Sequence, residues 1–229
     1  MAAMVKVLDL FSGLRGWSQP WMDAGHQTFT IDWEESFQAD AHLDIGDTQR
    51  VLDALPWWPD VVLASPPCNS FSTMSMGRMW TPEGEPKHHI AVEGRRLVLA
   101  TLRLLTILQP TFWVVENPRA RLRTLELMAG IPRVTVTYCQ YGEARMKPTD
   151  LWGRFPAGWR PRPACRNGDP CHVAAPRGST TGTQGTHKAD AGKIPYQLSQ
   201  ELMEAMLDVH GQELERPALP ATPQQRLWA

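Results

Sequence analysis

The chain has 229 residues, of which 42% are apolar and 21% are charged, so it can bury one core of ordinary domain size and is not a disordered tail. It has no run of about 18 apolar residues and no signal-peptide layout at its start, so we expect a cytoplasmic protein without membrane contact. The formal net charge of −1 conceals an uneven distribution, because residues 1–60 hold ten acidic and three basic side chains while residues 119–166 hold three acidic and ten basic ones.

Strand-like and helix-like segments alternate along the chain. Short apolar runs predict strands at residues 5–11, 28–31, 60–64 and 112–115. Apolar residues at helical spacing predict helices over roughly 17–24, over 92–108, and from Ser199 as the N-cap to about residue 209. This alternation favours an α/β fold with an open, mostly parallel sheet. Ligands of such folds bind beyond the carboxyl ends of the strands, where this chain carries polar and proline-bearing clusters.

The composition changes after residue 153. Residues 154–193 contain five prolines and six glycines, which predicts a long loop or a small irregular unit. We therefore divide the chain into a main domain at 1–153, this loop-rich segment at 154–193, a helical return to the main domain at 194–211, and a loose tail at 212–229.

The basic part of the chain, residues 119–166, has two interpretations. It can form a face that binds nucleic-acid phosphates and gains from counterion release, or it can be a solvated basic surface. Four arginines are our candidates for phosphate contacts: Arg121, Arg123, Arg160 and Arg162.

The first strand ends in Asp9 and runs into a glycine-bearing turn that closes at Gly16. Backbone N–H groups in such a turn can meet a phosphate or a carboxylate, although a plain strand-to-helix turn has the same composition. Asp32 ends the second strand about 20 residues later, where it can accept hydrogen bonds from a ribose hydroxyl pair, and Trp33 offers a flat face for adenine. Together these residues indicate a cofactor that carries a nucleoside.

Cys68 follows the third strand in the sequence SPPCNSFS, which is the strongest local feature of the chain. Two prolines make its approach rigid, and a thiol at such a turn is better placed to react than a buried cysteine. Glu116 ends the neighbouring strand in the sequence VVENP, so its carboxyl group should face the same ligand. A thiol and a carboxyl at one edge suit nucleophilic attack on a ring carbon with proton donation to the adjacent ring nitrogen.

Six motifs occur in the linear order of one known family: DLFSG, IDWE, LDIGD, SPPCNSFS, VVENP and IPYQL. On these residues the chain resembles the DNA cytosine-5 methyltransferases over about residues 5–209, and most of all their short, phage-type members. The resemblance implies a Rossmann-like S-adenosylmethionine-dependent methyltransferase fold. The loop-rich segment 154–193 would then recognise the target, and its small size limits the surface available for reading a sequence.

The resemblance also implies roles for individual residues. The cofactor would be S-adenosylmethionine, bound around Asp9, Phe11, Ser12, Gly13, Asp32, Trp33, Asp44, Ile45 and Pro66. Cys68 would attack C6 of a cytosine flipped out of double-stranded DNA, because C6 cannot be reached inside a stacked duplex. Glu116 would hold N3 and the exocyclic amine, so that C5 accepts the methyl group.

One family element is incomplete. Members usually carry a Gln-x-Arg-x-Arg element after a Tyr-Gly pair, whereas this chain, aligned on Tyr141-Gly142, has Arg145, Lys147 and Thr149. Of this family element, the chain therefore keeps only the positive charge. Arg145 and Lys147 are our candidates for contacts with the cytosine O2 and nearby phosphates.

Cys165, Cys171 and His172, with His187 further along, lie in the loop-rich segment. They are either free thiols in a polar loop or a zinc site that pins it. The Cys165-x5-Cys171 spacing differs from the common short cysteine pairs of zinc sites, so we predict no metal and keep zinc as the alternative.

Two alternatives to DNA methylation stay open. The catalytic residues do not distinguish DNA from RNA, so the same chemistry on RNA is the first. A catalytically silent nucleic-acid-binding module is the second, and intact Cys68 and Glu116 argue against it. We expect the protein to act as a monomer.

Overall fold

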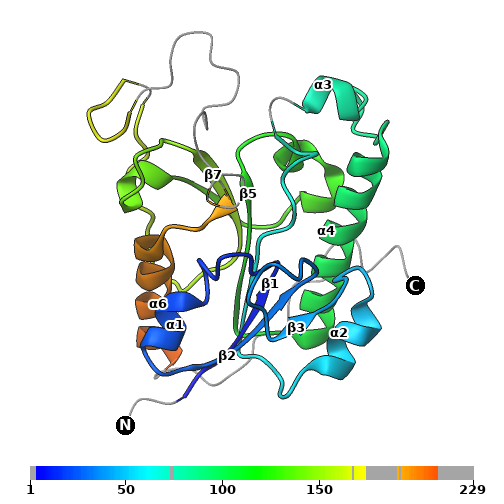
Figure 1. The fold of residues 1–229 in the computed structure, drawn as a ribbon. Coiled ribbons are helices and arrows are strands. Elements are labelled where there is room, and N and C mark those ends of the chain that lie inside the picture. The colour runs from blue at the N-terminus through cyan, green and yellow to red at the C-terminus, as the bar shows by residue number, and fades with distance from the viewer. Residues whose placement is uncertain (1–3, 73–74, 167, 174–189, 191, 211–229) are drawn as a thin grey trace.

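The computed structural model describes residues 4–72, 75–166, 168–173, 190 and 192–210 (Figure 1). Its centre is a seven-stranded sheet with the order β3-β2-β1-β4-β5-β7-β6. The strands are β1 (Lys6–Leu10), β2 (Gln27–Asp32), β3 (Ala41–His42), β4 (Val61–Ala64), β5 (Phe112–Pro118), β6 (Arg133–Thr137) and β7 (Pro148–Arg154).

The sheet is parallel except at one strand. β1, β2, β3, β4 and β5 pair in parallel, whereas β7 is antiparallel to both β5 and β6. The prediction of a mostly parallel sheet is confirmed. Because β1, β2, β4 and β5 all run the same way, the polar clusters that follow them gather along one edge.

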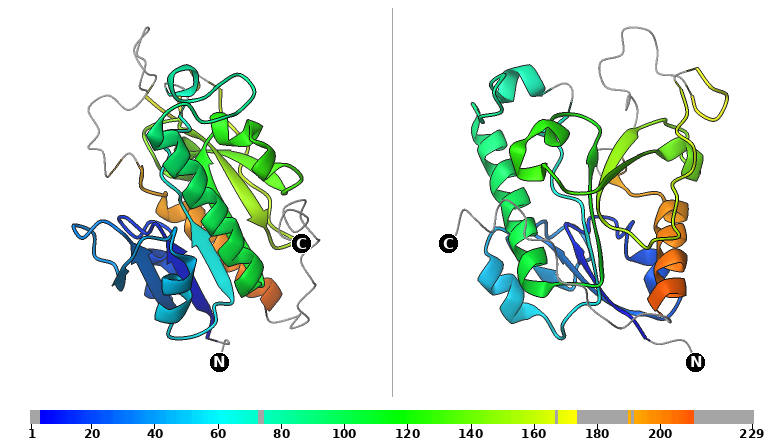
Figure 2. Two further views of the ribbon diagram at one scale, coloured as in Figure 1. Left: turned by 90° about the vertical axis from the view of Figure 1, so that its right-hand side faces the viewer. Right: turned by 180° about the vertical axis from the view of Figure 1, so that it is seen from behind.

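Helices cover both faces of the sheet (Figure 2). One face carries α1 (Gln19–Asp23) and α6 (Tyr196–His210), and the other carries α2 (Thr48–Ala54) and α4 (His89–Leu108). Shorter elements are α3 (Met76–Met79) and the 3-10 helices η1 (Arg121–Thr124), η2 (Glu126–Met128) and η3 (Tyr138–Tyr141). No helix among the described residues combines the length and the apolarity that crossing a membrane requires.

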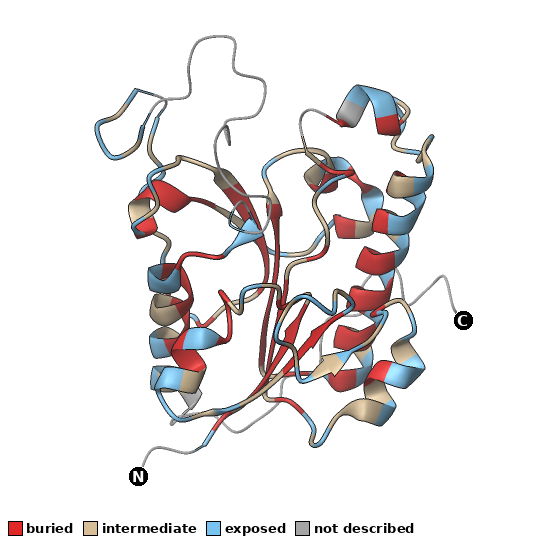
Figure 3. Ribbon diagram, viewed as in Figure 1, coloured by how far each residue is buried: buried red, intermediate tan, exposed pale blue. Residues whose placement is uncertain are grey.

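The core consists of two layers, one on each side of the sheet (Figure 3). Successive strand residues point to opposite faces, so in β4 Val61 and Leu63 pack towards α1 and α6 while Val62 and Ala64 pack towards α4. All four are buried, which explains why this strand is an uninterrupted apolar run.

The last helix begins earlier than predicted. α6 starts at Tyr196, directly after Pro195, whose carbonyl accepts from the backbone N–H groups of Leu198 and Ser199. Ser199 is therefore not the N-cap: it lies inside the helix, and its hydroxyl donates to the carbonyl of Trp17 at 2.5 Å. The serine ties α6 to the turn before α1.

The chain between β7 and α6 is irregular where it is described. Trp159 is buried and stacks on Phe155, but from Arg160 to Val173 no described residue is buried. Most of residues 174–193 and the tail 212–229 lie outside the described residues, so the predicted division into domains stays a prediction.

Candidate active site

A cavity of about 280 Å³ opens at the edge of the sheet where β1, β2, β4 and β5 end. Nine of the residues singled out in the sequence line it: Phe11, Ser12, Gly13, Asp32, Trp33, Pro66, Cys68, Glu116 and Lys147. Residues 192–194, which precede α6, close another side of the cavity. We call this cavity the cleft.

The turn after β1 has an unusual backbone. Phe11 and Arg15 have positive backbone φ angles of 60° and 56°, which residues other than glycine rarely adopt. Gly13 between them has a φ of 48°. Two hydrogen bonds hold the turn: the Ser12 N–H donates to the Ile31 carbonyl and the Gly13 N–H donates to Asp32 Oδ2 at 2.9 Å. A Cβ atom on Gly13 would meet nothing within 4 Å, so a ligand can approach the backbone there.

Asp32 and Trp33 present complementary surfaces to the cleft. Asp32 is 6% exposed, and its second oxygen, Oδ1, accepts from the Glu34 N–H at 3.0 Å. Each carboxylate oxygen has a further lone pair, which suits a pair of ribose hydroxyls. Trp33 is 65% exposed and has its ring available for stacking. The two residues fit the nucleoside part of S-adenosylmethionine.

The segment that carries Cys68 is fixed at several points. The Trp17 indole N–H donates to Ser65 Oγ at 2.9 Å, and the buried Asn117 amide donates to the Pro66 carbonyl at 2.8 Å. The Cys68 carbonyl accepts from the backbone N–H groups of the turn that follows. Asn117 is next to Glu116 in β5. Its hydrogen bond therefore also fixes the segment that carries Cys68 against the strand that carries Glu116.

The surroundings of Cys68 disfavour its thiolate form. Burial raises the pKa of the Cys68 thiol, the negative charge of Glu116 raises it further, and Lys147 acts in the opposite direction. The half-buried side chain nevertheless reaches the cleft. Its reactivity therefore depends on the nearby cation and on groups that bind beside it.

Glu116 is 4% exposed, and two side chains approach its Oε1 atom. The buried Tyr138 hydroxyl donates to it at 2.9 Å, and Lys147 Nζ lies 3.7 Å from it. Lys147 also lies 4.4 Å from the centre of the Tyr138 ring. Sequence reasoning missed Tyr138, although it lies three residues before the Tyr141-Gly142 pair that aligns the incomplete family element.

Three of the predicted cofactor residues do not line the cleft. Asp9 is fully buried in β1, and burial raises the pKa of its carboxyl group to about 7, while hydrogen bonds from Ser18 act in the opposite direction. Asp44 pairs with Arg96 at 2.8 Å, and Ile45 belongs to the core. Their roles at the cofactor stay predictions.

The arginines predicted to contact DNA all have partners within the chain. Arg123 forms an ion pair with the buried Asp150, and Arg162 forms one with Glu201 and lies over the Tyr141 ring. Arg121 and Arg160 donate to backbone carbonyls.

Arg145, the candidate beside Lys147, pairs with Glu143 at 3.2 Å and is not among the residues that line the cleft. Of the two candidates in the incomplete family element, only Lys147 reaches Cys68 and Glu116.

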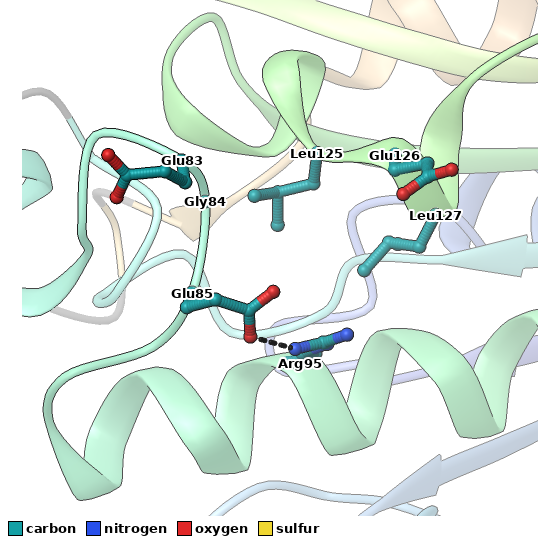
Figure 4. A pocket seen from close by; sticks show the side chains of 7 residues that line it. All are labelled: Glu83, Gly84, Glu85, Arg95, Leu125, Glu126 and Leu127. Atoms are coloured by element: carbon teal, nitrogen blue, oxygen red, sulfur yellow. Dashed lines mark hydrogen bonds and ion pairs between the residues drawn. The ribbon is translucent and has the colours of Figure 1, made fainter.

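A smaller hollow of about 70 Å³ lies between the loop that precedes α4, α4 itself and η2 (Figure 4). It contains an ion pair between Glu85 and Arg95 at 2.9 Å, in which Glu85 is exposed and Arg95 is half-buried. None of the predicted site residues lines it, so the cleft is the candidate active site.

The sheet order, the single reversed strand and a cleft at the strand ends define an α/β Rossmann-like methyltransferase fold, as predicted. The model of the family described as "C-5 cytosine-specific DNA methylase" matches residues 5–125, more than half of the chain. The chain therefore belongs to this family, and the enzyme class predicted from the sequence is confirmed.

Two relatives and one solved structure illustrate the similarity. A probable DNA (cytosine-5)-methyltransferase of Frog virus 3 (isolate Goorha) is 28% identical over 216 residues, which cover 87% of this chain and 99% of the relative. The type II methyltransferase M.HgiGI of Herpetosiphon aurantiacus is 27% identical over 137 residues, covering 55% of this chain and all of the relative. The Entamoeba histolytica methyltransferase EhMeth matches with a TM-score of 0.48 and 14% identity over 66% of this chain, which spans about half (53%) of that structure.

Proposed function

We propose that this protein transfers a methyl group from S-adenosylmethionine to C5 of cytosine in DNA through a covalent adduct between Cys68 and a flipped base. The observation that carries the proposal is the convergence of Cys68, Glu116 and Lys147 in the same cleft as Asp32 and Trp33. A thiol, a carboxyl and a cation thus lie beside a surface that suits a nucleoside.

The cofactor, when bound, supplies an electrophilic methyl group. The chain's own contribution is to hold the cofactor. Asp32 accepts hydrogen bonds from the ribose hydroxyls, Trp33 stacks on the adenine, and the open backbone at Gly13 leaves room for the amino-acid part. The buried Ser12 hydroxyl, which lines the cleft without a hydrogen-bond partner among the described residues, is a further group that a ligand would satisfy.

The steps that the protein performs follow from the three side chains that would surround the flipped cytosine: Cys68, Glu116 and Lys147. The Cys68 thiol gives its proton to the Glu116 carboxylate and forms a bond to C6, and Glu116 passes that proton to N3 as electrons move into the ring. C5 then takes the methyl group. The C5 hydrogen then leaves as a proton to solvent, and the electron pair of the C5–H bond forms the C5=C6 double bond as the bond between C6 and sulfur breaks. The proton on N3 returns through Glu116 to the Cys68 thiolate.

Lys147 and Tyr138 prepare Cys68 and Glu116 for this reaction. Lys147 lowers the pKa of the Cys68 thiol and, at 3.7 Å from Glu116 Oε1, places positive charge beside the site where the cytosine O2 would bind. Tyr138 orients the Glu116 carboxyl through its hydroxyl. Tyr138 is a positioning residue, because it acts on the base only through Glu116.

The DNA side of the proposal rests on charge and access. A cytosine must leave the duplex before Cys68 can reach its C6 atom. Of the arginines predicted to contact phosphates, we assign Arg160 to the DNA because it is exposed and, among the described residues, donates to carbonyls of its own loop. Arg123 and Arg162 are assigned to the fold, since each forms an ion pair within it.

Trapping with 5-fluorocytosine tests the proposal. Fluorine at C5 cannot leave as a cation, so the chain should stay covalently joined to duplex DNA that carries the analogue, and denaturing electrophoresis should show the adduct. Its formation should require S-adenosylmethionine and Cys68.

Two results would refute the mechanism: an adduct formed by the Cys68→Ser variant, or methyl transfer by the parent without any adduct. Parallel assays with duplex DNA and tRNA identify the substrate. Transfer to tRNA alone would replace DNA in the proposal and keep the chemistry.

A further inference from the structure

Four potential metal ligands from three parts of the chain meet at one point outside the cleft. Cys139 lies on η3, Cys165 lies in the irregular chain after β7, and Cys171 and His172 follow a short turn. Their three Sγ atoms and a ring nitrogen of His172 all lie within 4.8 Å of one another. None of them lines the cleft.

The distances between these atoms suit a single tetrahedral ion. Zinc bonds of about 2.3 Å to sulfur and about 2.0 Å to nitrogen separate neighbouring ligand atoms by about 3.5–3.8 Å. The observed separations are 3.7 Å for Cys139–Cys171, 3.7 Å for Cys165–His172 and 3.6 Å for Cys171–His172. Cys139 and Cys165 are closer, at 3.0 Å, and need a small movement to admit the ion.

We propose that Cys139, Cys165, Cys171 and His172 Nδ1 bind a structural zinc ion that fastens the irregular segment after β7 to η3. Three thiolates and one imidazole in a closed tetrahedron form a common structural zinc site, and four protein ligands leave no position for a substrate. An iron–sulfur cluster is wider than a single ion, so its thiolates would be spread further apart.

Surrounding contacts support this assignment. The Gln140 amide donates to Cys171 Sγ at 3.3 Å, which favours a thiolate there, and the Cys165 N–H donates to Thr137 Oγ1 at 3.1 Å, which fixes the chain at this ligand. His172 presents Nδ1 to the sulfur atoms, so its Nε2 carries the proton in the bound form.

The segment would gain from such a fastening because only polar contacts, such as those of Arg162, join it to the rest of the described chain. From Arg160 to Val173 no described residue is buried, so apolar packing contributes little to its order. A zinc site supplies folding free energy directly to a chain that lacks a core. It would also fix η3, where Cys139 follows Tyr138, the residue that orients Glu116.

The spacing of Cys165 and Cys171 alone does not reveal this site, because one ligand is distant in the sequence. Cys139 lies 26 residues before Cys165, on a 3-10 helix of the main domain, and the fold brings it next to the others. His187, the fourth ligand considered from the sequence, lies outside the described residues.

Metal content and thiol reactivity of the purified full-length chain test the proposal. Protein expressed in zinc-supplemented medium and kept reduced should contain one zinc ion per chain. A thiol reagent should then modify no cysteine other than Cys68, whose raised pKa slows its own reaction, and should modify three further cysteines after a strong chelator removes the zinc. Cobalt in place of zinc should give the visible absorption of a tetrahedral thiolate site.

Matched variants separate this site from the catalytic thiol. Cys68→Ser should keep the full zinc content, whereas Cys171→Ser should lose it. His172→Cys keeps four ligands, so it should retain the metal and change the cobalt spectrum. This second variant tests the site even if Cys171→Ser fails to fold.

The proposal is wrong if the parent carries no zinc, if a Cys139–Cys165 disulfide persists in the reduced protein, or if Cys68→Ser loses the metal as Cys171→Ser does. The test does not depend on methyl transfer, so the proposed zinc site and the proposed function can fail separately.

Discussion

The cysteines of this chain lie in two regions with opposite surroundings. Cys68 is a single thiol at the edge of the cleft, with Glu116 and Lys147 beside it and room for a substrate in front. Cys139, Cys165 and Cys171 face one another and His172, and none of these four residues lines the cleft. A thiol surrounded by charges and open space suits nucleophilic attack, and a thiol among other soft ligands suits a metal.

The two regions also differ in what holds them. The cleft is built on the ends of β1, β2, β4 and β5, so the sheet positions its side chains before any ligand arrives. The cysteine cluster joins irregular chain to a short 3-10 helix and has no comparable support. Substitutions in the cleft should therefore change chemistry and leave the fold intact, while substitutions in the cluster should change the fold locally.

The largest expected effect comes from Glu116→Gln. A neutral amide cannot donate the proton that N3 needs, so methyl transfer and adduct formation should slow by about 10²–10⁴-fold. Single-turnover assays would measure the rate, and zinc content should stay unchanged. Glu126→Gln, which alters an exposed carboxylate on η2, is the control and should retain the parent rate. A Glu116→Gln rate close to that of the parent would show that Glu116 does not take part in the reaction, and the cleft would no longer differ from the cysteine cluster in this respect.

Asp32→Asn should weaken the binding of S-adenosylmethionine by about ten- to a hundred-fold, because charge-assisted hydrogen bonds to the ribose are lost. Asp53→Asn is the matched control: its carboxylate accepts from Gln49 on the exposed α2 and should not affect binding. Calorimetry on both folded variants makes the comparison. Unchanged affinity in Asp32→Asn would remove this residue from the cofactor site.

Lys147→Met should make the reaction more dependent on alkaline pH. Lys147 lowers the pKa of Cys68 against the effects of burial and Glu116, so its loss raises that pKa and reduces the thiolate fraction near neutral pH. The rate of adduct formation against pH should move its midpoint upwards, and a thiol pKa higher by about one pH unit slows the reaction at neutral pH about tenfold. Lys193→Met, which removes another cation from the cleft, should leave the midpoint in place.

The smallest effect is expected at the basic surface. Arg160→Ala should reduce the salt dependence of DNA binding by about one in the log–log slope, equally for all sequences. Arg162→Ala should instead lower the thermal midpoint, since its partners Glu201 and Gln140 belong to the fold. Identical slopes for the parent and Arg160→Ala would show that this arginine only solvates the surface.

The parallel strands that end at the cleft, and the points at which they end, could be predicted well from the sequence. The run Val61–Ala64 is wholly apolar because helices cover both faces of the sheet, and prolines mark its end. β6 and β7 were not predicted, although β6 alternates polar and apolar residues over Arg133–Thr137, which is typical of a strand. β7 has no such alternation: it contains a proline and a glycine, and it buries the polar Thr149 and Asp150.

The same limit applies to the candidate site. Cys68, Asp32 and Glu116 were predicted because each lies at or near the end of a strand with a recognisable apolar pattern. Tyr138 and Cys139 escaped notice because their importance depends on partners 22 and 26 residues away in sequence. The arginines were read as DNA contacts because charge is visible in a sequence, whereas a buried partner such as Asp150 is not.

The approach of Ile194 to the first turn has a consequence for how the protein is made. A Cβ atom on Gly16 would lie 2.7 Å from the Ile194 nitrogen, and the nearby hydrogen bond from Ser199 to Trp17 joins residues 182 positions apart. On the ribosome, the turn after β1 emerges long before the segment that covers it. The nascent chain therefore lacks one wall of the cleft until α6 has been synthesised, and cofactor binding should begin only after that point.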